Sequence, residues 1–196
     1  MPLSLATVGA KITASFINAI VSRVNRQGLT SIIPTTVTGA GVTLGSTGTV
    51  TFAAVTSGSI NGCFTSEFDN YRIECNFTSA SSDLRIRLRA AGTDATGGAD
   101  YGTQVVAAAS GTVSSAVYGV GFSYLSTAVL TGHWGSVDMF APAIAGPTRW
   151  TGLFSGPVSL TSSGGNHVLS VSYDGITIYP AAGTLSGTIR IYGYNN

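Results

Sequence analysis

The chain has 196 residues, only 9% of them charged, and its formal net charge is +1. Ordinary globular chains carry roughly 25% charged residues. Two explanations of the low charge are compatible with each other. Much of the surface is buried in an assembly, or Ser, Thr, Asn and Gly keep the protein soluble. A charge near zero argues against binding to nucleic acid or an anionic membrane. Apolar stretches broken well short of ~20 residues exclude a transmembrane helix.

An amphipathic helix is predicted near the start of the chain and is expected to end at Gly28. The predicted helix has a short coiled-coil seam, in which Ile17, Ile20 and Val24 occupy heptad positions a, d and a. Isoleucine at both a and d favours coiled coils of three or four helices over two. Such a helix either packs on its own domain or self-associates. The range 1–28 is interpreted as a helical attachment and oligomerisation segment.

Residues 29–60 are extended and rich in Thr, Val and Gly. The run Thr49 to Phe52 contains good strand formers, and frequent Gly–Ser and Gly–Thr breaks indicate short strands and turns. This range is expected to be an extended linker, or shoulder strands, between the helix and the main body.

A regular strand pattern begins at about residue 61. Apolar and polar residues alternate over 71–77 and again over 84–89, so one face of each predicted strand belongs to the core. The Ser-rich bend at 79–83 is interpreted as a hairpin loop joining these two strands. Asp174-Gly175 is interpreted as a second, tighter hairpin.

Eight further strands are expected, at 103–109, 113–119, 121–130, 133–140, 148–154, 167–173, 176–179 and 185–194. Strands spaced every ~8–12 residues without intervening helices indicate an antiparallel sandwich or barrel. The predicted fold class is all-β: an antiparallel β-sandwich, jelly-roll-like head over 61–196, preceded by a short N-terminal α-helix.

Three arginines, Arg85, Arg87 and Arg89, share one face of a predicted strand. They form a solvated face with partial salt bridges, a subunit interface, or a site for an acidic ligand such as a charged glycan. The guanidinium fork suits an interface, and so does the scarcity of lysine, which occurs only at Lys11. These arginines and the helix seam are the candidate interface residues.

No constellation of catalytic residues is evident. Glu67 and Asp69 are two carboxylates of the kind that glycosidases use, but a pair at this spacing is more often a solvent-facing edge. The two histidines, His133 and His167, have neither metal-site nor triad spacing. The chain is therefore predicted not to be an enzyme and to need no cofactor or metal.

The two cysteines are Cys63 and Cys75. The first residues lack the positive n-region and continuous apolar core of a secretory signal, so the chain is expected to fold in a cytoplasm. Free thiols are favoured there, while a bridge between neighbouring strands stays open.

Several segments resemble virion proteins of tailed bacteriophages. The opening "GAKITASFINAIVSRVN" is similar to the start of phage tail-associated proteins. The likeness extends over about 60–196 and, loosely, over 9–25. The segments that carry it in the main body are Phe64-Thr65-Ser66, Phe68-Asp69-Asn70-Tyr71, Leu84 to Arg89, Gly92-Thr93-Asp94 through Tyr101, and Gly187 to Gly193.

The resemblance implies a fibre, tail, collar or capsid-decorating protein of the virion, assembled in the host cytoplasm. Such proteins are commonly homotrimers with a β-sandwich head. Their N-terminal region attaches to other virion proteins, and the head can contact a glycan or protein of the host surface. The resemblance implies no active site. Because this chain is short and has no long shaft, a compact knob or spike fits better than a whole fibre.

Two alternatives remain open. A stand-alone, lectin-like glycan-binding module predicts a monomer in solution and a sugar-dependent thermal shift. A glycan-degrading enzyme predicts that Glu67→Gln or Asp69→Asn abolishes hydrolysis and leaves the fold intact.

Overall fold

The structure is a computed structural model that describes residues 28–109, 112–126 and 130–195. This part of the chain contains sixteen β-strands and no α-helix. No helix within it is long and apolar enough to cross a membrane. The predicted N-terminal helix, with Ile17, Ile20 and Val24, lies outside the described residues.

Every strand pairing is antiparallel, and the strands form two sheets. The larger sheet has ten strands in the order β10 (Thr112–Val120), β9 (Tyr101–Ala109), β14 (Ser159–Val171), β13 (Gly146–Ser155), β12 (Leu130–Phe140), β6 (Asn70–Ala80), β16 (Leu185–Tyr194), β4 (Val50–Val55) and β3 (Val42–Leu44), with β1 (Thr30–Ile32) paired to β16. The smaller sheet has six strands in the order β11 (Ser123–Ser126), β7 (Leu84–Ala90), β15 (Gly175–Pro180), β5 (Gly58–Asn61) and β2 (Thr36–Thr38), with β8 (Thr93–Asp94) paired to β7.

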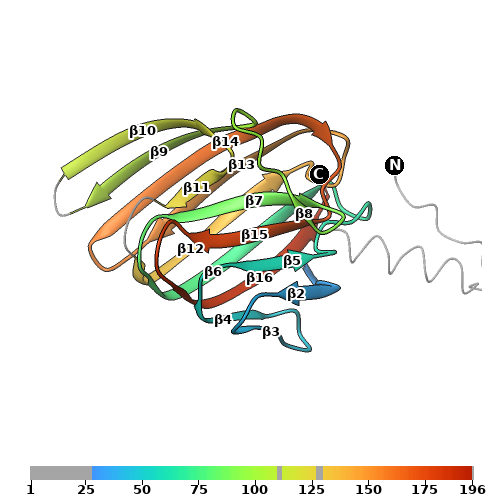
Figure 1. Cartoon of the computed structure of the whole chain (residues 1–196), viewed down its shortest axis with the longest axis horizontal. Helices are drawn as coiled ribbons and strands as arrows, with labels where there is room; N and C mark the ends of the chain where they lie inside the picture. The colour runs from blue at the N-terminus through green and yellow to red at the C-terminus, as the bar shows by residue number, and fades with distance from the viewer. Residues whose placement is uncertain (1–27, 110–111, 127–129, 196) are drawn as a thin grey trace, which may run out of the picture.

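The two sheets pack face to face, and the ends of β9 and β10 extend past the smaller sheet (Figure 1). Alternation along each strand places one set of side chains between the layers, as a half-buried strand requires. The aromatic members of this core include Trp150, Tyr71, Tyr101, Phe52, Phe77 and Phe154. The predicted all-β, two-sheet antiparallel sandwich is therefore confirmed.

A cross-sheet hydrogen bond supplements this apolar packing. The Tyr101 hydroxyl, from the ten-stranded sheet, accepts a hydrogen bond from the backbone N–H of Leu88 in the six-stranded sheet, at 2.9 Å. The same hydroxyl donates to the carbonyl of Ala95 at 3.1 Å. Burial raises the pKa of Tyr101, so the phenol stays protonated and keeps both roles.

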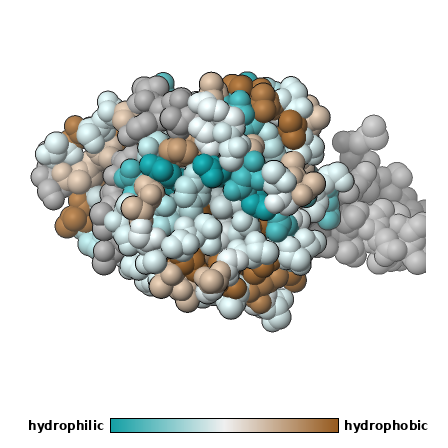
Figure 2. All heavy atoms as spheres, viewed as in Figure 1, coloured by the Kyte–Doolittle hydropathy of each residue, from teal (hydrophilic) through white to brown (hydrophobic). Residues whose placement is uncertain are grey.

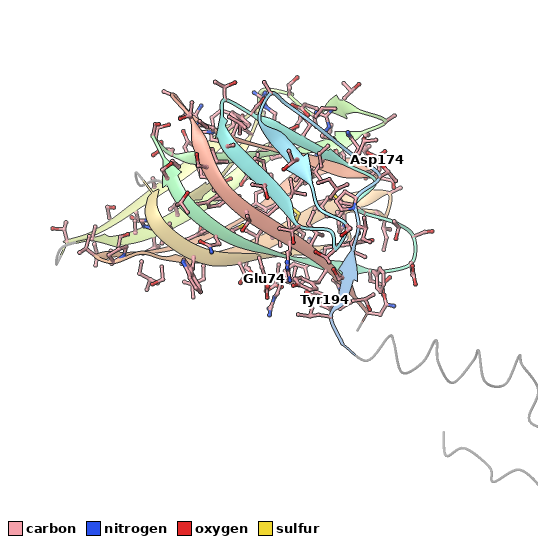
Figure 3. All side chains as sticks on the ribbon, turned by 90° about the horizontal axis from the view of Figure 1, so that it is seen from below. Glu74, Asp174 and Tyr194 are labelled. Atoms are coloured by element: carbon pink, nitrogen blue, oxygen red, sulfur yellow. The ribbon has the colours of Figure 1, made fainter. Side chains whose placement is uncertain are left out.

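Both predicted hairpins are wrong, because each bend carries the chain from one sheet to the other. The bend at 79–83 joins β6 of the larger sheet to β7 of the smaller one, and Asp174 lies between β14 and β15. The carbonyl of Asp174 accepts hydrogen bonds from the N–H groups of Cys63 and Phe64, at 2.9 and 3.2 Å. Asp174 thus lies at a junction between segments, at one end of the sandwich (Figure 3).

Two further ranges, 29–60 and 159–171, supply strands to the sandwich. The strand expected at 167–173 begins eight residues earlier, as β14, and its start is rich in Ser and Gly. The range 29–60 supplies strands to both sheets, and its residues Val50, Phe52 and Ile60 are buried in the core. The sandwich therefore begins before residue 61.

Candidate functional site

The three arginines of the predicted row lie on β7, on the outer face of the six-stranded sheet. Figure 2 views this side of the molecule, and hydrophilic residues run across its middle. Arg89 is held most firmly: it forms an ion pair with Asp94 and donates to Ser59 Oγ at 3.0 Å and Thr177 Oγ1 at 2.8 Å. Its Nε donates to Asn61 at 3.0 Å. The Arg89 guanidinium is therefore occupied within its own chain.

The other two arginines stack on aromatic rings. The Arg85 guanidinium lies 4.1 Å from the centre of the Phe122 ring, and that of Arg87 lies 5.0 Å from the Tyr179 ring. Arg87 Nε also donates to the carbonyl of Gly121 at 3.0 Å. Cation–π contacts of this kind are worth ~0.5–1 kcal/mol at exposed sites. Burial raises the pKa of Tyr179, with Arg87 and Arg85 acting in the opposite direction.

Two further charged residues, Arg72 and Glu74, lie on β6 of the ten-stranded sheet. Arg72 forms a bidentate pair with Asp138 of β12, in which Nε and Nη2 each donate at 2.8 Å. Glu74 projects away from the sandwich (Figure 3). The outer faces of the two sheets therefore carry separate sets of charges.

One half of the outer face of the ten-stranded sheet, over β13, β14, β9 and β10, carries four exposed apolar side chains that we call the apolar patch: Val106, Val113, Leu153 and Leu160. These side chains are 46–71% exposed. They occupy two adjacent cross-strand rows, in which Leu160 and Val113 each pair with Ala108, and Leu153 and Val106 each pair with Ser162. Contiguous exposed apolar surface typically marks an interaction site.

The other half of this face contains the Trp134 hollow, a depression of about 490 Å³. The outward-pointing residues of β12, β6 and β16 surround it in a two-by-three grid. Trp134, Asn76 and Thr188 form one row, and Ser136, Glu74 and Arg190 form the next. Trp134 is 67% exposed, whereas Trp150 is 2% exposed. An exposed tryptophan beside five polar side chains suits a ligand with both apolar and polar faces.

The polar side chains of the Trp134 hollow make few contacts with the rest of the protein. Arg190 Nε donates to Thr49 Oγ1 at 2.9 Å. Glu74 is the register partner of Arg190, yet no ion pair within 4.0 Å joins it to any described residue. The Glu74 carboxylate is therefore open to a ligand or to water.

A second depression, of about 540 Å³, lies on the same sheet over β9, β14 and β13. Most of its lining is small or amide side chains, among them Gln104, Ser162 and Asn166, and Val106 of the apolar patch also lines it. Among the residues that the structure describes, its lining includes no aromatic side chain and no charged group. It therefore offers fewer recognition elements than the Trp134 hollow.

The two carboxylates considered for catalysis lie on one exposed segment. Glu67 and Asp69 are both exposed, and Asn195 binds the backbone of this segment, accepting from Asp69 N–H at 2.8 Å and donating to the Glu67 carbonyl at 3.3 Å. No described group of three His, Cys, Asp or Glu residues is placed to hold a metal ion.

The two cysteines are free and buried. Burial raises the pKa of both Cys63 and Cys75, which keeps the thiols protonated and unreactive. The free-thiol alternative is therefore the one that the structure contains.

Sequence reasoning located the arginine row but missed the apolar patch and the Trp134 hollow. Both are assembled from strands that are distant in the sequence, such as β6, β12 and β16. The available signal was the alternation of side chains along each strand. The odd-numbered residues His133 and Val137 are buried, so the even-numbered Trp134 points outward.

Comparison with known proteins yields little. No family model matches the chain, and no curated protein matches it. Among solved structures, a lectin from Bauhinia forficata in complex with GalNAc is similar at 9% sequence identity and a TM-score of 0.22. That comparison covers 84% of this chain and 98% of the lectin chain.

Proposed function

We propose that the chain is a structural protein of a tailed-phage virion, forming a homotrimeric knob or spike on the tail or capsid. In this proposal the head is jelly-roll-like, the segment 1–28 attaches it to other virion proteins, and the head contacts a glycan or protein of the host surface. The protein has no enzymatic role.

The observation that carries the proposal is the exposed apolar patch on a chain with only 9% charged residues. Large apolar side chains clustered on one sheet face favour burial against another subunit, since monomers rarely leave a wide apolar patch in water. In a ring of three copies the patch of one subunit meets a different surface of the next. The resemblance of 60–196 to virion proteins supports the same assignment.

The arginine row contributes less to this proposal than the sequence predicted. Arg89 has hydrogen-bonding partners within its own sheet, and Arg85 and Arg87 stack on Phe122 and Tyr179. Pairing with carboxylates of a neighbouring copy would require breaking these contacts. We therefore place the subunit contact on the apolar patch.

The mass of the purified chain in solution tests the proposal. Light scattering at micromolar concentration is expected to give about three times the chain mass of 19.9 kDa. A stable monomer would overturn the trimer and favour the stand-alone glycan-binding module. Immunogold labelling of intact phage particles with an antiserum against the chain tests the virion assignment separately, and unlabelled particles would contradict it.

A further inference from the structure

We propose that the Trp134 hollow binds a neutral hexose unit through Trp134 and the polar grid of Asn76, Glu74, Ser136, Thr188 and Arg190. A role for this site in host attachment rests on the proposed function, but sugar binding itself does not. The inference adds a site and a ligand class to that function.

The first element of recognition is the tryptophan. A pyranose ring presents C–H groups on one face, and these pack against the negative face of an aromatic ring. Trp134 is 67% exposed, and its direct cross-strand neighbours, Asn76 on β6 and Ser155 on β13, are short polar side chains. A ligand covering the Trp134 side chain would remove apolar surface from water without displacing a packed neighbour.

The second element is the set of polar groups beside the ring. The Glu74 carboxylate, the Asn76 amide and the Ser136 and Thr188 hydroxyls supply both acceptors and donors. Neighbouring sugar hydroxyls need this mixture, because each one both donates and accepts. The grid spans three strands, ~4.8 Å apart, so its width matches a single sugar ring.

The charge of the hollow favours a neutral ligand. Glu74 and Arg190 face each other across β6 and β16, so their charges cancel to first order. An acidic sugar would meet the unpaired Glu74 carboxylate, and a cationic ligand would meet Arg190. The volume of about 490 Å³ lies within the range of roughly 300–1,000 Å³ typical of small-molecule sites.

Intrinsic fluorescence gives a direct test, because the two tryptophans differ so strongly in exposure. Trp134 is the component that iodide reaches, and Trp150 is buried. We would titrate the full chain with the methyl glycosides of glucose, galactose and mannose and with N-acetylglucosamine. At least one is expected to give a saturable blue shift and to protect the fluorescence from iodide.

Three variants assign the signal. Trp134→Ala should abolish the response, and Glu74→Gln should weaken the affinity by about tenfold or more, since a carboxylate accepts hydrogen bonds more strongly than an amide. Phe140→Ala removes another exposed aromatic of β12 outside the hollow. This matched control should leave the affinity unchanged.

The outcomes separate this site from the proposed trimer when the mass is measured on the same samples. A trimer that responds to none of the four sugars overturns the sugar site and leaves the trimer standing. A monomer that gives a saturable sugar response supports the sugar site and overturns the trimer. If iodide cannot reach Trp134 in the intact assembly and Trp134→Ala lowers the mass, the tryptophan lies in a subunit contact and the sugar site is wrong.

Discussion

At the scale of single residues, one buried histidine, His167, is expected to make the stability of the sandwich depend on pH. His167 is fully buried, and its ring meets that of Tyr101 edge-on with 4.4 Å between centroids. Its Nδ1 lies 3.0 Å from the Tyr173 hydroxyl. Burial lowers the pKa of His167, while Asp100, at 4.0 Å from Nε2, acts in the opposite direction.

This arrangement predicts a loss of stability in mild acid. Below pH ~6.5 the unfolded chain binds a proton at His167 that the folded protein resists. The free energy of unfolding should therefore fall as the pH drops from 7.5 to 5. Urea denaturation at the two pH values should show a smaller fall in His167→Gln, which does not titrate. The surrounding carboxylates are common to both proteins, so an unchanged fall would show that the histidine is not the cause.

Residue roles were predictable from the sequence only where a role depends on the residue's own strand. Alternation alone identified Leu84 and Ile86 as core residues, and both are buried. The partners of Arg85 and Arg89 were hidden, because Phe122 and Asn61 come from distant parts of the chain. The sequence alone does not show whether the guanidinium of an arginine faces water, an aromatic ring or a carboxylate.

At the scale of elements, a bulge in β16 depends on one glycine. The register of β16 against β6 shifts between Ser186 and Gly187, where the backbone of Gly187 has a φ of +146°. A Cβ at this position would lie 2.3 Å from the carbonyl oxygen of Asn76 and 2.7 Å from the Cα of Phe77. Both contacts are with the backbone of a central strand, which cannot move aside easily.

We therefore expect Gly187→Ala to lower the free energy of unfolding by about 2 kcal/mol or more, through strain and steric overlap. Chemical denaturation would measure the change. The matched control is Gly146→Ala in β13, where an added Cβ meets no atom within 4 Å. That control should stay within about 0.5 kcal/mol of the unaltered protein. Equal effects of the two substitutions would contradict the role of the bulge.

Strand existence was predictable because period-2 alternation is a local signal, whereas strand partners were not. The bends at 79–83 and at Asp174 have ordinary turn chemistry, and local chemistry does not distinguish a hairpin from a crossover between layers. The two cases are distinguished by the other strands of each sheet. β6 has β12 and β16 on its two sides, and β7 has β15 and β11, so β6 and β7 do not pair with each other. That information is spread over the whole chain.

At the scale of the whole molecule, the two outer faces have opposite characters. The six-stranded sheet carries half-buried arginines that contact other side chains of the chain, and the ten-stranded sheet exposes the apolar patch beside the Trp134 hollow. Composition predicted a covered surface, and the sequence left the arginine row open between a solvated face, a subunit interface and a ligand site. The low charge is a property of the whole chain and carries no positional information, so only the folded topology could locate the patch.

The proposed trimer contact at the apolar patch can be tested by placing a charge within the patch. Leu160 is 46% exposed in the middle of the patch, and Leu160→Glu would bury a carboxylate without a partner at the contact, at a cost of several kcal/mol. Light scattering should then report the chain mass of 19.9 kDa in place of the trimer. The matched control is Ile33→Glu, a substitution at a 57% exposed apolar residue between β1 and β2. Because both positions are exposed within one chain, neither change should lower the stability of the subunit much. A trimer that survives Leu160→Glu but dissociates with Ile33→Glu would move the contact from the patch to the opposite margin of the sandwich.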